Sequence, residues 1–286
     1  MKLLRVGQRG SEKPAALDTE GKIRDLSTHI KDLNPENLNF EIISKLKDIN
    51  LTSLPEINSK ERIGSCISKP GKFIAIGLNF SDHAAETGAK PPPEPITFMK
   101  ATSSINGPND DIQIVSGSKK LDWEVELGLV IGKEAKHISE DQSQDHILGY
   151  CLVNDVSERE WQIEKMGQWV KGKSHDTYGP IGPYLVTADE IQDVNNLKMS
   201  LDVNGNRMQT GNTNTMIFNV NVIVSYLSKF MSLQPGDIIT TGTPPGVGMG
   251  MKPQQFLKAG DTLRLSIESL GCLLYTSPSP RDSGKS

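Results

Sequence analysis

The strongest constraint in this sequence is a strictly alternating segment at residues 122–131, DWEVELGLVI. Every second residue is apolar, which predicts a β-strand with one buried face made of Trp123, Val125, Leu127, Leu129 and Ile131. Glu124 and Glu126 then share the opposite face, with Cα atoms roughly 6.5 Å apart. Two carboxylates this close in a protected site repel each other unless a proton or a cation separates them. The alternative is a solvated strand face carrying two ordinary glutamates.

Asp155 supplies a third carboxylate at the end of a second apolar run, residues 147–154. Sheets commonly present ligand-binding groups where such strands end. Three carboxylates without a neighbouring His or Cys form an oxygen-only set, which suits Mg²⁺, Mn²⁺ or Ca²⁺ and not Zn²⁺. The alternative role for Asp155 is to cap the helix that we expect from Ser157 to about Met166.

His83 and Glu86 lie three residues apart in a helix expected after Phe80, so they face the same side of its first turn. A carboxylate beside an imidazole raises its basicity, and such a dyad activates water. The alternative is a surface ion pair, which is common and weak.

Two Gly/Pro-punctuated segments complete the candidate site, and we expect both to be loops. Lys173 lies in the first, where it either stabilises an oxyanion or is simply solvated. The second, residues 241–250 (TGTPPGVGMG), lacks the following helix that a dinucleotide fingerprint requires. We expect its backbone N–H groups and Thr243 to approach an anion such as a substrate carboxylate.

Composition excludes several classes of protein. The 286 residues carry a formal net charge of −4, and 23% of them are charged, which suits a soluble globular chain and argues against a nucleic-acid partner. Cys66, Cys151 and Cys272 are too few and too scattered for a disulfide framework or a zinc cage. The sequence shows no signal peptide and no apolar run of membrane-spanning length. We therefore expect a cytoplasmic protein with no membrane partner.

The order of the predicted elements indicates a β-rich α+β fold. Residues 1–68 predict a small N-terminal α/β module that ends in a linker at about 51–64, and residues 69–271 predict the main domain. The Ser/Pro-rich end continues no pattern and resembles translated sequencing-adapter sequence, so residues 272–286 are predicted to be a non-native or disordered tail.

The segments GLNFSDHAAE, FMKATSSINGP, DWEVELGLVIG, NDVSEREWQ, GQWVKGKSHDTYGPIGP, NGNRMQTGNT and TGTPPGVG, in this order, resemble the fumarylacetoacetate hydrolase family. Within it, the chain is most similar to the 2,4-diketo-3-deoxy-L-fuconate or L-rhamnonate hydrolase group, whose members are often labelled ureidoglycolate lyases. The resemblance implies a mixed β-roll and a homodimer. One departure is Phe80, where the family commonly has Tyr.

The resemblance also implies roles for single residues. It makes Glu124, Glu126 and Asp155 the ligands of the divalent metal, usually Mg²⁺ or Mn²⁺. His83 and Glu86, on a lid, would activate water, and Lys173 would stabilise the oxyanion. The substrate contacts that it implies are Gln162 and Thr243.

The function that follows from the resemblance is hydrolytic C–C cleavage of a small 2,4-diketo acid, a 2-oxo acid substrate, to pyruvate and a second carboxylic acid. The alternatives are ureidoglycolate lyase, oxaloacetate-type decarboxylase or tautomerase, or 2-oxo acid hydratase on the same metal chelate, because fold does not decide chemistry. A non-catalytic metabolite-binding protein is a further alternative.

Overall fold

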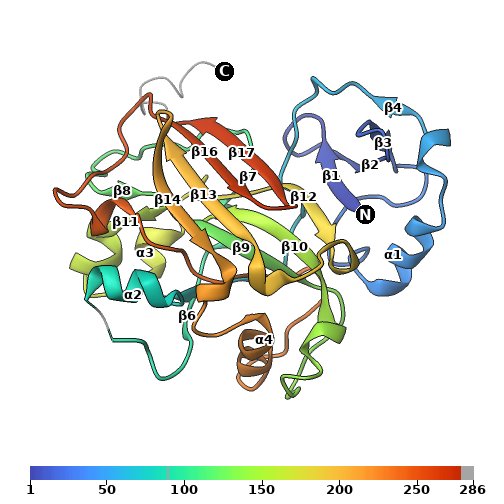
Figure 1. Ribbon diagram of the computed structural model, residues 1–286. Coiled ribbons are helices and arrows are strands. Elements are labelled where there is room, and N and C mark those ends of the chain that lie inside the picture. Colours follow the sequence, from blue (N-terminus) through green and yellow to red (C-terminus); the bar gives the residue numbers. More distant parts are fainter. Residues whose placement is uncertain (89, 278–286) are drawn as a thin grey trace.

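The computed structural model describes residues 1–88 and 90–277, and a large mixed sheet runs through its centre (Figure 1). In this eleven-stranded sheet β10 (Ile147–Asn154) lies between β9 (Val125–Ile131) and β12 (Gly179–Thr187). The sheet continues from β12 to the edge strand β4, and from β9 to the edge strand β6. Its other members are β1 (Lys2–Val6), β2 (Lys13–Leu17), β3 (Ile23–Asp25), β4 (Glu56–Ile57), β5 (Phe73–Gly77), β6 (Ile96–Met99), β7 (Ile105–Asn106) and β15 (Ile238–Thr240).

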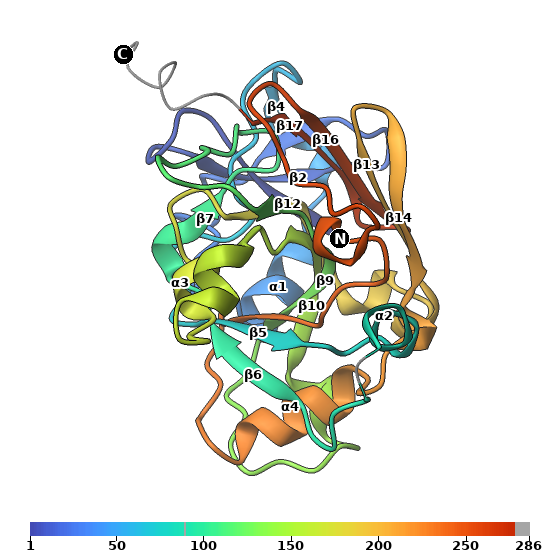
Figure 2. The ribbon, with the colours of Figure 1, turned by 90° about the vertical axis from the view of Figure 1, so that its left-hand side faces the viewer.

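A second sheet of four strands lies against β9 and β10 (Figures 1 and 2). Its strands, in spatial order, are β14 (Asn206–Asn212), β13 (Lys198–Val203), β16 (Thr262–Ile267) and β17 (Gly271–Thr276). A short pair, β8 (Leu121–Asp122) with β11 (Ser157–Glu158), lies beside the ends of β9 and β10. The predicted β-rich α+β class is confirmed.

The central strands have a core on each face, so all seven residues of β9 are buried, whether they are apolar or charged. Leu127 and Leu129 belong to the core shared with the four-stranded sheet, whereas Val130 belongs to a second core on the other face. Helix α1 (Phe40–Lys47) covers that second core, and α4 (Val220–Ser228) closes the first one at the end away from the four-stranded sheet (Figure 2). The site is therefore built on a rigid, two-sided scaffold.

The N-terminal module is joined to the main domain through the sheet itself. β1 pairs antiparallel with β12, with Leu3 opposite Leu185, and both leucines belong to the same core. Part of the expected linker is a strand, because Ile57 of β4 pairs with Ile23 of β3. No helix among residues 1–88 and 90–277 has the length and apolar character needed to cross a membrane.

The prediction that the chain leaves the fold at Cys272 is wrong for residues 272–277. β17 forms a full antiparallel ladder with β16, in which Leu273 faces Leu265 and Tyr275 faces Leu263. Leu273 and Tyr275 are buried, and their alternation with less buried neighbours is the strand signal that the Ser/Pro-rich context obscured. The rest of the predicted tail, residues 278–286, lies outside the described residues.

The helix expected from Ser157 to about Met166 is also corrected. Ser157 and Glu158 form β11, and a π-helix follows at Glu160–Glu164. Glu158 is fully buried and accepts hydrogen bonds from Ser118 and from the backbone N–H of Lys120, which hold this segment extended. A π-turn inside a helical segment is frequently found at a functional site.

Candidate functional site

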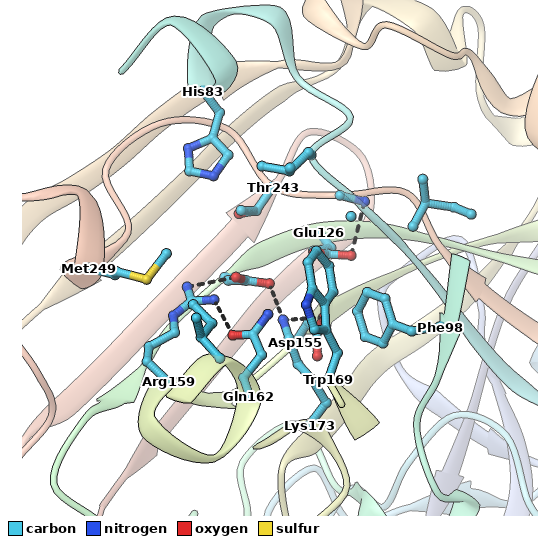
Figure 3. A pocket seen from close by; sticks show the side chains of 16 residues that line it. His83, Phe98, Glu126, Asp155, Arg159, Gln162, Trp169, Lys173, Thr243 and Met249 are labelled. Atoms are coloured by element: carbon cyan, nitrogen blue, oxygen red, sulfur yellow. Dashed lines mark hydrogen bonds and ion pairs between the residues drawn. The ribbon is translucent and has the colours of Figure 1, made fainter. Parts of the chain in front are cut away.

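Three buried carboxylates meet where β9 begins and β10 ends (Figure 3). Glu126 belongs to β9, Glu124 immediately precedes that strand, and Asp155 immediately follows β10. The backbone N–H of Asp155 donates to the carbonyl oxygen of Glu124 over 3.0 Å, which fixes the two chain segments together. One oxygen from each carboxylate lies within 4.8 Å of the other two. The structure thus brings together the three residues that the sequence singled out.

Three buried cations surround these carboxylates. Lys173 Nζ lies 2.7 Å from Glu124 Oε2 and 2.8 Å from Asp155 Oδ2. Lys100 Nζ lies 2.6 Å from the other oxygen of Asp155. Arg159 Nη2 lies 2.7 Å from Glu124 Oε1. Glu124 and Asp155 are therefore each held at both oxygens, which leaves their side chains little rotational freedom.

The two glutamates differ in their electrostatics although they are two residues apart. Burial raises the pKa of Glu124, but Lys173 and Arg159 outweigh burial and hold this pKa at about 2. Burial also raises the pKa of Glu126, and the nearby Asp155 and Glu124 raise it further. Glu126 is thus the carboxylate of the three at which a proton would compete with a bound cation.

The donor set fits a hard divalent cation. Four buried carboxylates face three buried cationic side chains, so one negative charge stays uncompensated unless a proton or a cation binds. The carboxylates are those of Asp122, Glu124, Glu126 and Asp155, and the cationic side chains are Lys100, Arg159 and Lys173. Carboxylate oxygens are the ligands that Mg²⁺, Mn²⁺ and Ca²⁺ prefer.

Lys173 ends a short helix, α3 (Val170–Lys173), and is not the solvated loop residue that one reading of the sequence allowed. Its carbonyl oxygen accepts a hydrogen bond from Lys100 Nζ. Burial lowers the pKa of Lys173, but Asp155 and Glu124 outweigh burial and raise this pKa above its ordinary value. Lys173 therefore stays cationic inside the site and is placed to meet developing negative charge.

The loop after β15 does hold anions with its backbone, as predicted, but they are the protein's own carboxylates. The N–H of Gly242 donates to Glu126 Oε2 over 3.0 Å. The N–H groups of Gly248 and Met249 donate to the two oxygens of Asp122 over 2.7 and 2.9 Å. These three N–H groups are occupied within the protein, so their expected approach to a substrate carboxylate is corrected, whereas the substrate contact of Thr243 stays a prediction.

His83 and Glu86 form the expected contact on α2 (Ser81–Thr87), with 3.1 Å between Nδ1 and Oε2. Asn79, two residues before this helix, forms side-chain hydrogen bonds with the backbone at Phe218 and Thr241. The Glu86 carboxylate also accepts the N–H of Gly246 over 3.1 Å, which ties α2 to the loop after β15. His83 is buried and lines the pocket above the carboxylates (Figure 3).

Gln162 and Thr243 also line this pocket, which encloses about 250 Å³. Gln162 Oε1 accepts from Arg159 Nη1 over 3.0 Å. The Thr243 hydroxyl donates to the carbonyl of Val125 over 2.9 Å and accepts from Gln209 Nε2 over 2.8 Å. Both side chains are therefore oriented by the protein before any ligand arrives.

The sequence reasoning missed Arg159 and Lys100. Arg159 bridges Asp122, Glu124 and Gln162, and its spacing of three residues before Gln162 was an available helical signal. Lys100 directly follows the apolar strand β6, but its partner Asp155 lies 55 residues further along the chain. Nothing local in the sequence predicts that contact.

The chain matches a known protein family over most of its length. Residues 72–276 match the sequence profile of the family described as "Fumarylacetoacetate (FAA) hydrolase C-terminal". A protein of Burkholderia ambifaria named "Putative hydrolase" is 56% identical over 282 residues, which cover 98% of this chain and 100% of that protein.

Two solved structures are similar over almost the whole chain. Fumarylacetoacetate hydrolase from Exiguobacterium antarcticum superposes with a TM-score of 0.88 at 33% identity, covering 98% of this chain and 99% of that one. Maleylpyruvate hydrolase from Sphingobium sp. SYK-6, solved with manganese(II) and pyruvate, superposes with a TM-score of 0.81 at 25% identity and the same coverage. The chain belongs to the fumarylacetoacetate hydrolase family.

Proposed function

We propose that this protein is a divalent-metal-dependent hydrolase that cleaves a C–C bond of a small 2,4-dioxo acid to give pyruvate and a second carboxylic acid. The observation that carries the proposal is the buried cluster of Glu124, Glu126 and Asp155 beside Lys173, with the His83–Glu86 dyad lining the same pocket. A metabolite-binding protein needs no such dyad, whereas hydrolysis requires water to be activated.

The three carboxylates would hold the metal, and Mg²⁺ or Mn²⁺ suits them best, with Ca²⁺ as a further candidate. The bound ion supplies Lewis-acid stabilisation of negative charge on the oxygens of a 2-oxo acid. The similar maleylpyruvate hydrolase, solved with manganese(II) and pyruvate, supports this assignment.

The protein's own groups then carry the proton and the charge. His83, oriented by Glu86, takes a proton from water as the water oxygen bonds to C4 of the substrate. Lys173 stabilises the oxyanion that forms on C4. The C3–C4 bond breaks, C3 takes up a proton, and the C4 fragment leaves as the carboxylic acid. Gln162 and Thr243 would contact the substrate.

Product analysis in ¹⁸O-labelled water tests this function. The protein is loaded with Mg²⁺ or Mn²⁺ and offered 2,4-dioxo acids, oxaloacetate and ureidoglycolate, with a chelator-treated sample as control. Label in the carboxylic acid released from the C4 side, together with loss of turnover in chelator, is expected. Release of carbon dioxide without label incorporation would replace the hydrolase proposal with a decarboxylase.

A further inference from the structure

The pocket has apolar and aromatic side chains on both sides of the carboxylates. Trp169 and Phe98 pack edge to face with ring centroids 5.2 Å apart, on one flank of the carboxylates, and Met249 lies on the opposite flank (Figure 3). We call the apolar side chains of both flanks together the apolar wall, and they are Ile76, Leu78, Phe98, Ile163, Trp169 and Met249. Ile163 is 46% exposed, so the wall extends to the mouth of the pocket.

A glycine makes room for the indole. A Cβ atom on Gly77, at the end of β5, would lie 2.4 Å from Trp169 Cζ3. That separation is far shorter than any non-bonded carbon–carbon contact, so the indole ring packs directly against the backbone of Gly77. Any side chain at position 77 would therefore displace Trp169.

The apolar wall and the reactive groups are placed by the same short helix. Trp169 is the N-cap residue of α3 and Lys173 is its last residue. Lys173 Nζ also lies 5.2 Å from the centroid of the Phe98 ring. A ligand whose head is bound at the carboxylates and Lys173 consequently has the apolar wall directly beside it.

Several polar atoms of the pocket already have partners in the protein. His83 contacts Glu86, Gln162 accepts from Arg159, and the Thr243 hydroxyl both donates and accepts within the fold. A substrate hydroxyl that meets these atoms, and not Gln162 Nε2, would thus compete with existing hydrogen bonds or be buried unpaired. Each unpaired hydroxyl weakens binding by about tenfold or more.

We infer that the substituent on the C4 side of the substrate is an uncharged alkyl or aryl group and not a polyhydroxylated chain. This inference rests on the proposed function for the identity of the reacting head, and it differs from the sugar-acid tail that the family resemblance implied. The pocket of about 250 Å³ limits the substituent to a few carbon atoms beyond C4.

Matched substrates test the inference on the metal-loaded enzyme. 2,4-Dioxopentanoate, -hexanoate, -heptanoate and -octanoate form an alkyl series, and 5,6-dihydroxy-2,4-dioxohexanoate matches the octanoate in the number of tail atoms. We expect kcat/KM to rise by about fourfold per methylene until the pocket is full, and the dihydroxy compound to be the poorer of the matched pair. A flat series, or preference for the dihydroxy compound, would overturn the inference.

Variants and a binding assay separate this inference from the proposed function. Trp169→Gln and Gly77→Ala should flatten the alkyl series, whereas Trp161→Gln, whose ring stacks on Lys165 and lies outside the pocket, should keep it. Calorimetric binding of 2-oxo acids with the same tails to the Mn²⁺-loaded protein repeats the comparison without catalysis. Tail-dependent binding without hydrolysis would refute the proposed function alone, and hydrolysis with no dependence on the tail would refute the inference alone.

Discussion

Replacing Leu273 with alanine measures how much β17 contributes to the core. Leu273 is fully buried opposite Leu265, in the core between the two sheets, while the next residue, Leu274, is 52% exposed on the other face of the strand. Leu→Ala at a fully buried core position lowers the free energy of unfolding by about 2–5 kcal/mol, because apolar atoms are no longer buried and a cavity is left behind. The same change at an exposed position costs roughly 0.5 kcal/mol or less.

The assay is urea unfolding of Leu273→Ala and Leu274→Ala, followed by tryptophan fluorescence and circular dichroism. We expect a clear loss of stability for the first variant and almost none for the second. Two truncations extend the test, since a chain ending at Gly271 should be strongly destabilised, whereas one ending at Ser277 keeps the whole β17 ladder. Equal behaviour of the two leucine variants would show that β17 does not pack as described.

Three further predictions concern the site and the assembly. Glu126→Ala should abolish turnover and lower the affinity for the metal, with little change in the fold. In the wild-type protein the metal affinity should fall as the pH drops through the raised pKa of Glu126, because protons then compete with the metal. Isothermal titration calorimetry at several pH values checks both expectations. His83→Ala should lose roughly 10²- to 10⁴-fold in hydrolysis while substrate still binds, and Glu86→Gln should lose less, since the imidazole remains; equal losses in steady-state kinetics would contradict the dyad. We also propose a homodimer, so light scattering should give twice the mass of one chain, and a monomer at assay concentrations would exclude this assembly.

Local patterns in the sequence predicted the parts of the site that lie on one or two strands. Strand alternation placed Glu124 and Glu126 on one face, and the end of an apolar run marked Asp155. All three carboxylates could therefore be located without tertiary information. Lys100 could not, because it follows β6 and Asp155 follows β10, two strands that are not neighbours in the sheet, and their contact arises only in the folded chain.

The same contrast applies to the fold. The strong apolar runs gave the central strands correctly, whereas Ser157 looked helical by its surroundings and forms a strand because Asp122 lies opposite it. Asn is a preferred helix N-cap, yet Asn79 joins segments that are 139 and 162 residues away. Tertiary hydrogen bonds of this kind override local preference.

The loop after β15 fixes Asp122, Glu126 and Glu86 through main-chain N–H groups. Its path is enforced at Gly246 and Gly248, where a Cβ atom would lie 1.9 Å from a carbonyl oxygen of Met208 and of Gln255, respectively. The loop thus holds the carboxylates through its backbone and not through its side chains. A loop side chain that faces the pocket, such as Met249, can therefore change during evolution without disturbing the carboxylates.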